Sequence, residues 1–166
     1  MERLRRILVV DGSRVVRATL AKHLKDDFEI LEESDGISAW QTLMLDANIS
    51  AVISGIHPPK LEAHDLLARL RASSMRRLRE IPFVLIVSDL NNDAERQYDR
   101  TCGVTGFITK TMARVAIVEI LSRILDPGLA ELTTTSILPE IELPKDEAVP
   151  QPSTEAAGEA QTAPLT

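Results

Sequence analysis

Five short aliphatic runs alternate with five helical patterns over the first 126 residues, and this alternation constrains the fold more than any other feature of the chain. The runs are rich in β-branched residues and have the length of buried strands. They cover residues 6–10, 28–32, 49–53, 81–87 and 105–109. Apolar residues recur at helical spacing over residues 16–24, 37–47, 61–78, 93–102 and 113–125. Such alternation, with short connections, predicts a parallel sheet covered by helices on both faces.

The residues at the ends of the predicted strands are the first candidates for a functional site. In an open parallel sheet, the functional crevice lies beyond the carboxyl ends of the strands. Asp11, Gly55, Ser88 and Lys110 stand at or just after four of these ends. We therefore expect these four residues to meet at one edge of the sheet.

Composition divides the chain near residue 126. Residues 127–166, called the tail below, hold seven acidic residues, one basic residue and six of the nine prolines, whereas residues 1–126 hold 18 acidic and 18 basic residues. This indicates a globular domain over residues 3–126 and a tail that is mostly disordered or a linker. Residues 136–143 of the tail, SILPEIEL, carry four aliphatic side chains. They either dock in extended form on the domain or a partner, or form only an apolar patch within a linker.

The sequence argues against a metalloprotein, a nucleic-acid-binding protein and a membrane protein. Cys102 is the only cysteine, and His23, His57 and His64 lack the spacing of a metal motif. The formal net charge of −6 comes from the tail, so the neutral domain has no bulk electrostatic reason to bind nucleic acid. No apolar run approaches the length of a membrane span or of a signal peptide. We expect a cytoplasmic protein that binds no membrane.

Three motifs, in the same order and at the same spacing, resemble the receiver domains of bacterial two-component response regulators. Residues 7–13, ILVVDGS, resemble the opening strand and acidic corner of that family. Residues 51–59, AVISGIHPP, resemble the strand that ends in the phosphorylated aspartate, and residues 103–110, GVTGFITK, resemble the last strand with its lysine. The match runs from about residue 4 to 125, and receivers that precede diguanylate cyclase domains are especially similar. The resemblance implies a flavodoxin-like α/β/α sandwich whose five-stranded parallel sheet has the order 2-1-3-4-5.

The residues that carry receiver chemistry are incomplete in this sequence. In the family an aspartate accepts the phosphoryl group and an acidic pair holds Mg²⁺. By the resemblance, Gly55 stands at the acceptor position, four residues before Pro59, and Gly12 stands at one position of the acidic pair. Asp11 is then the only remaining acidic ligand. We therefore predict no aspartyl phosphate, no bound metal and no cofactor.

The remaining receiver positions are better preserved. Ser88 lies 22 residues before Lys110 and can stand for the family's switch hydroxyl, although counting from the start of the strand leaves Val87 as an alternative. Phe107 fills the aromatic switch position. Thr111 follows Lys110 where the family has a proline, which puts the family's cis peptide bond in doubt.

Several residues allow a functional and a purely structural interpretation. Asp11 either contacts Lys110 across the crevice or caps the first helix. Ser54 and His57 flank the acceptor position and are conceivable replacement nucleophiles, but packing of the loop is favoured. The arginines at 69, 71, 76, 77 and 79 are interpreted as a solvated helix face, with an anionic partner as the minority hypothesis. Trp40 is expected in the core.

The predicted function is that of a degenerate receiver, a non-enzymatic signalling module that acts by protein–protein contact without phosphorylation. The resemblance places the contact, with a partner or in a homodimer, on the surface formed by residues 93–102, 105–109 and 113–125. One alternative is a receiver that accepts phosphoryl groups on an unconventional residue. Another is the regulatory part of a longer regulator of the diguanylate cyclase type.

Overall fold

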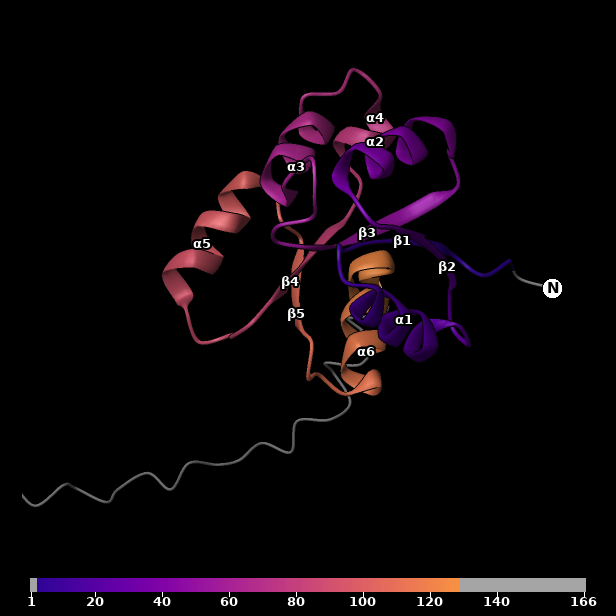
Figure 1. Cartoon of the computed structure of the whole chain (residues 1–166), viewed down its shortest axis with the longest axis vertical. Helices are drawn as coiled ribbons and strands as arrows, with labels where there is room; N and C mark the ends of the chain where they lie inside the picture. The colour runs from indigo at the N-terminus through magenta and orange to yellow at the C-terminus, as the bar shows by residue number, and fades with distance from the viewer. Residues whose placement is uncertain (1–2, 129–166) are drawn as a thin grey trace, which may run out of the picture.

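A computed structural model describes residues 3–128 and shows a five-stranded parallel sheet between two layers of helices (Figure 1). The strand order is β2-β1-β3-β4-β5, so the predicted fold class and topology are confirmed. The strands are β1 (Arg6–Val10), β2 (Glu29–Glu33), β3 (Ile49–Gly55), β4 (Phe83–Val87) and β5 (Gly106–Thr109). The predicted docking segment, residues 136–143, lies outside the described residues.

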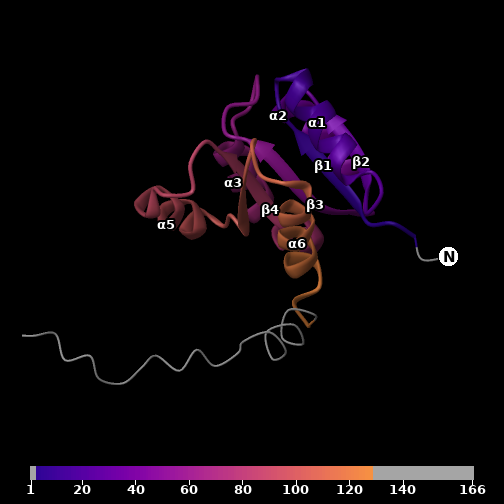
Figure 2. The ribbon, with the colours of Figure 1, turned by 90° about the horizontal axis from the view of Figure 1, so that it is seen from below.

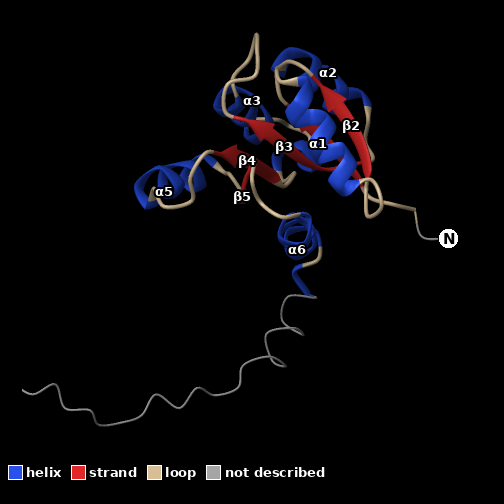
Figure 3. Ribbon diagram, turned by 60° about the horizontal axis from the view of Figure 1, so that its bottom comes forward, coloured by secondary structure: helices blue, strands red, loops and turns tan. Residues whose placement is uncertain are grey.

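Six helices connect and cover the strands in the described part of the chain, and they flank the sheet on both sides (Figure 3). They are α1 (Arg14–Leu24), α2 (Gly36–Leu45), α3 (Ala63–Arg71), α4 (Arg76–Arg79), α5 (Asp93–Cys102) and α6 (Arg114–Leu125). Figure 2 shows α5 set apart from the other helices. No helix among residues 3–128 is both long enough and apolar enough to cross a bilayer.

Each face of the sheet has its own hydrophobic core, because successive strand residues point to opposite faces. Ile7 and Val9 of β1 pack in one core with Leu24 of α1 and Leu121 of α6. Leu8 and Val10 pack in the other core, which α2, α3 and α4 complete and to which the side chain of Phe107 belongs. Trp40 is partly buried against this second core, as predicted.

Residues 61–78, predicted to be helical for most of their length, form two helices and not one. The structure has α3 and α4 there, separated by a turn at residues 72–75. The Ser73 hydroxyl accepts a hydrogen bond from the Met75 amide at 3.2 Å, which gives the backbone a local alternative to the helical pattern. Leu78 is fully buried and anchors the short α4. The bounds of β1 and α5 agree with the prediction, and the other helices and strands differ from it by at most two residues at either end.

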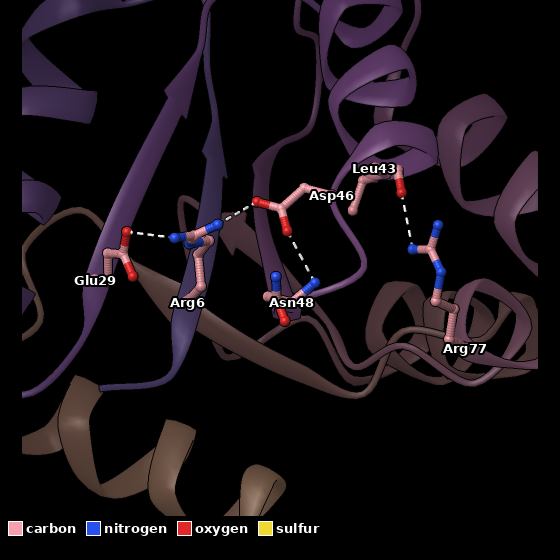
Figure 4. Close-up of polar contacts among 6 residues, drawn as sticks. All are labelled: Arg6, Glu29, Leu43, Asp46, Asn48 and Arg77. Atoms are coloured by element: carbon pink, nitrogen blue, oxygen red, sulfur yellow. Dashed lines mark hydrogen bonds and ion pairs between the residues drawn. The ribbon is translucent and has the colours of Figure 1, made fainter. Parts of the chain in front are cut away.

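Hydrogen bonds among Arg6, Glu29, Asp46 and Asn48 form a polar cluster at the amino end of β1 (Figure 4). This end of the strand is opposite to the end that carries the candidate site. Arg6 donates to Glu29 Oε1 at 2.7 Å and to Asp46 Oδ2 at 2.5 Å. These bonds raise the pKa of Arg6, with the bond to Glu29 as the largest cause. Asp46 also accepts from the Asn48 amide, and mainly this bond lowers the pKa of Asp46. The cluster joins β1 to β2 and to the end of α2.

Candidate functional site

A cleft of about 470 Å³ opens at the carboxyl ends of β1, β3, β4 and β5. It brings together three of the four residues that the sequence placed at this edge, Asp11, Ser88 and Lys110. Its lining consists of Asp11, Ile56, His57, Ile86, Val87, Ser88, Lys110 and Thr111. Gly55 is the last residue of β3 and has no side chain to contribute, while Gly12 and Phe107 lie outside the lining.

The carboxylate of Asp11 fills the space where a side chain at position 55 would begin. A β-carbon built on Gly55 would collide with Asp11 Oδ2 and lie 3.2 Å from Asp11 Cγ. Gly55 is itself buried, and its backbone pairs with Ile86 of β4. A longer side chain at position 55 therefore requires the Asp11 carboxylate to move.

Asp11 is held in this position by its own loop. Its Oδ1 accepts a hydrogen bond from the Ser13 amide at 2.7 Å, and its backbone carbonyl accepts one from Arg17 Nη1 at 2.6 Å. Ser13, rather than Asp11, caps α1, because its hydroxyl accepts from the Val16 amide. No ion pair joins Asp11 to Lys110 within the part of the chain that the structure describes.

The residues present fit a magnesium ion poorly. Magnesium takes ligands in near-octahedral geometry, and in proteins one or two carboxylates, substrate phosphates and waters usually supply them. In the cleft, Asp11 supplies one carboxylate, and one oxygen of that carboxylate already accepts a hydrogen bond. A β-carbon on Gly12 would lie 2.9 Å from Pro59 Cδ, so an acidic side chain there would also have to displace the proline ring.

The structure distinguishes the two candidates for the switch hydroxyl. Val87 is the last residue of β4, is buried, and pairs with Thr109 of β5. Ser88 follows it, is exposed, and presents its hydroxyl at the cleft that Lys110 also lines. Both residues line the cleft, and Ser88 is the one of the two that carries a hydroxyl. No cis peptide bond occurs within residues 3–128.

Phe107 is buried beneath α5. Its ring is 8% exposed and packs in the core on the α3 side of the sheet. The guanidinium of Arg100, on α5, lies 5.5 Å from the ring centroid, within the range of a cation–π contact. The position of this aromatic ring is thus linked to the position of α5.

The two replacement nucleophiles differ in access. Ser54 is fully buried, and its hydroxyl donates to the Gly55 carbonyl at 2.8 Å, so it faces the core and not the cleft. His57 is exposed and lines the cleft, and its Nδ1 lies 3.1 Å from Glu62 Oε1. This carboxylate partner could not be predicted from the sequence, because Glu62 precedes α3 and is brought back to His57 by the loop after β3.

Comparison with known proteins gives one consistent answer. The chain is 29% identical to the chemotaxis protein CheY1 of Helicobacter pylori over 124 residues, which cover 72% of this chain and 96% of that protein. It is 28% identical to the two-component response regulator ORR5 of Oryza sativa over 121 residues, 72% of this chain and 87% of that protein. No protein-family model matches.

Solved structures share the fold over the same region. The chemotaxis response regulator CheY4 of Vibrio cholerae superposes with a TM-score of 0.65 at 21% identity, over 74% of this chain and 100% of that one. A response regulator of Chloroflexus aurantiacus gives 0.66 at 18% identity, over 74% and 98%. The described residues therefore share the fold of response-regulator receiver domains, and the chain is similar in sequence to response regulators.

A second cleft, of about 680 Å³, adjoins the first between α3 and α5. The two clefts share Ile56, His57, Val87 and Ser88 in their lining. In the second, His64 Nε2 lies 2.6 Å from Asp99 Oδ1, and Asp99 is the one buried residue of α5. The sequence analysis missed this pair, because residues 35 positions apart on two predicted helices carry no pairing signal.

The arginines at 69, 71, 76, 77 and 79 divide into exposed residues and partly buried ones. Arg71 is partly buried and donates to the carbonyls of Arg79, Ile81 and Gly103, at 3.1, 2.8 and 2.7 Å, and burial lowers its pKa. Arg77 donates to the carbonyl of Leu43 near the end of α2 (Figure 4). It also donates to the carbonyl of Met44. The remaining contacts are those of Arg76 with Glu80 and of Arg79 with the Ser73 carbonyl. Arg69, Arg76 and Arg79 are exposed, as predicted for a solvated helix face and loop. Arg71 and Arg77 instead bind backbone carbonyls, which the sequence did not predict.

Proposed function

We propose that this receiver domain signals without phosphorylation and without catalysing a reaction, by contact with a protein partner or a second copy. The proposal rests on one observation: the Asp11 carboxylate occupies the space that the β-carbon of a side chain at residue 55 would need. An aspartyl phosphate needs a carboxylate on β3 and a metal beside it. Here β3 ends in Gly55, and the space beside it is taken by the residue that would otherwise bind the metal.

The proposed contact surface is formed by α5, β5 and α6. β5 is an edge strand of the sheet and pairs only with β4 within the described residues. On α6, Val115 is 72% exposed, whereas Ile117 and Leu121 are buried against the sheet. The edge strand β5 offers backbone groups to a partner, and the exposed Val115 and the helix α5, which has one buried residue, offer side-chain contacts.

His57 supports a second candidate function, a receiver that accepts the phosphoryl group on a histidine. His57 lines the cleft, is exposed, and has Glu62 at its Nδ1, an arrangement that leaves Nε2 free to attack. Against it stands the poor magnesium site, since a phosphoryl donor is usually oriented by the metal.

The two candidates are separated by phosphorylation with a small acyl phosphate donor and Mg²⁺, followed by intact mass spectrometry at neutral pH. We expect the wild-type mass to stay unchanged and the Gly12→Asp/Gly55→Asp variant to gain one phosphoryl group. A wild-type gain that His57→Gln abolishes would establish the histidine acceptor and contradict the proposal. A gain that survives in His57→Gln would contradict both.

A further inference from the structure

An apolar groove of about 220 Å³ lies between α1 and α6, on the face of the sheet opposite α3. Leu20, Ile86 and Ile117 form its floor and are each no more than 5% exposed, while Val15 on its wall is 74% exposed. The full lining is Val15, Val16, Thr19, Leu20, His23, Ile86, Ile108, Thr109, Lys110 and Ile117. It adjoins the proposed partner surface and shares with it Ile108 and Thr109 of β5 and Ile117 of α6.

We propose that residues 136–143 of this same chain occupy this groove. The segment SILPEIEL combines aliphatic residues with two carboxylates, at Glu140 and Glu142. In an extended chain, side chains alternate between two sides, so Ile141 and Leu143 share the side opposite Glu142. Such a segment can turn aliphatic groups to the groove floor and a carboxylate to the solvent rim.

The connection is long enough for docking within one molecule. Arg5 donates to the Leu125 carbonyl at 2.8 Å and to Asp126 at 2.5 Å, which fixes the end of α6 beside the start of β1. Ile117 lies eight residues earlier on α6, about 12 Å along the helix. The ten residues from Asp126 to Ser136 span up to about 33 Å when extended. The segment therefore reaches the groove without strain in the connection.

The charges of the groove and of the segment are complementary. Lys110 lines the groove, and no acidic residue of the described chain does so. The segment carries two carboxylates in a tail whose acidic residues outnumber its basic ones by seven to one. Attraction of this kind is screened by salt, so it guides the segment to the groove while aliphatic burial supplies most of the affinity.

Docking at this groove would place the tail beside the candidate site. Lys110 lines both the groove and the cleft that holds Asp11 and Ser88. A segment bound in the groove thus contacts the lysine that the site presents and covers the exposed Val15. This inference does not depend on the proposed function, because it holds whether or not the domain is phosphorylated.

The proposal is tested with the full-length chain by NMR on isoleucine, leucine and valine methyl groups. We expect nuclear Overhauser contacts from the methyls of Ile137 and Ile141 to those of Val15 and Ile117. The Ile141→Ser/Leu143→Ser variant should lose these contacts and shift the groove methyl signals. The matched control Val149→Ser/Leu165→Ser, which alters tail residues outside the segment, should leave both unchanged.

A sample that mixes two differently labelled preparations decides whose segment is bound. Contacts only between methyl groups of the same labelled preparation confirm docking within one molecule. Contacts between methyl groups of the two preparations overturn the proposal in favour of docking on a second copy. Absence of contacts in the wild type, with groove signals equal in both variants, also overturns the proposal. Because both variants change only the tail, loss of the fold does not confuse the outcome.

Discussion

At the scale of single residues, Asp35 shows how a buried carboxylate stabilises this domain. It is 6% exposed and caps α2, accepting from the Ser38 amide at 2.8 Å and from the Ser38 hydroxyl at 2.9 Å. Lys60 Nζ lies 3.3 Å from its second oxygen. The hydrogen bond from the Ser38 backbone amide is the largest cause that lowers the pKa of Asp35 from its ordinary value of 3.8. The ionised form is therefore the one that the folded state prefers.

This preference predicts a pH dependence of stability. A carboxyl group whose pKa is lowered by folding contributes stability that is complete above its ordinary value of 3.8 and is lost as the pH falls through the lowered value. We expect Asp35→Asn, which keeps a capping side chain, to lose less stability than the wild type between pH 5 and acid conditions of about pH 2. Urea unfolding across this range checks the slope. Asp65→Asn, at an exposed position on α3, is the control, and a wild-type slope in Asp35→Asn contradicts the assignment.

At the scale of elements, α5 is held differently from the other long helices. Leu20 and Leu24 bury α1, and Leu66, Leu67 and Leu70 bury α3, but the one buried residue of α5 is Asp99. Its carboxylate lies 2.6 Å from His64 Nε2 on α3, and Arg100 lies over Phe107. Elements held by few apolar contacts open at lower free energy than the core. We therefore expect α5 to be the helix that moves most readily.

The contact between His64 and Asp99 predicts how single and double substitutions change the free energy of unfolding. Asp99→Leu leaves His64 without its partner, and we expect a loss of about 1–3 kcal/mol in the free energy of unfolding. The double variant His64→Leu/Asp99→Leu removes both polar groups and should recover most of that loss. Chemical denaturation with a double-mutant cycle measures the coupling. Strictly additive losses would show that the two side chains do not act as a pair.

At the scale of the whole molecule, the sequence predicted the architecture better than the site. Aliphatic strands such as residues 6–10 and 83–87 are buried on both faces, so their pattern is local and strong. The break between α3 and α4 was missed, because apolar spacing at 66, 67, 70 and 78 continues through a turn that the Ser73 hydroxyl stabilises. Local hydrogen bonds of this kind compete with the helix without changing its periodicity.

The candidate site was predicted as a set of positions but not as an arrangement. The parallel topology brings Asp11, Ser88 and Lys110 to one edge of the sheet regardless of their side-chain conformations. Their proximity therefore follows from the sequence. The turn of the Asp11 carboxylate toward Gly55, and its hydrogen bond to Ser13, depend on the conformation of one loop. The His57–Glu62 and His64–Asp99 contacts likewise arise only when separate segments pack.

The central claim is that the receiver scaffold has lost its phosphoryl input and kept its switch region. The most direct test is an amide-resolved NMR titration of the full chain with Mg²⁺ and beryllofluoride, an aspartyl phosphate mimic, beside the Gly12→Asp/Gly55→Asp variant. The account predicts no change in the wild type and shifts around Ser88 and Phe107 in the variant. Shifts at these residues in the wild type would contradict it, because they would require a working acceptor in a cleft where Asp11 is the one acidic side chain.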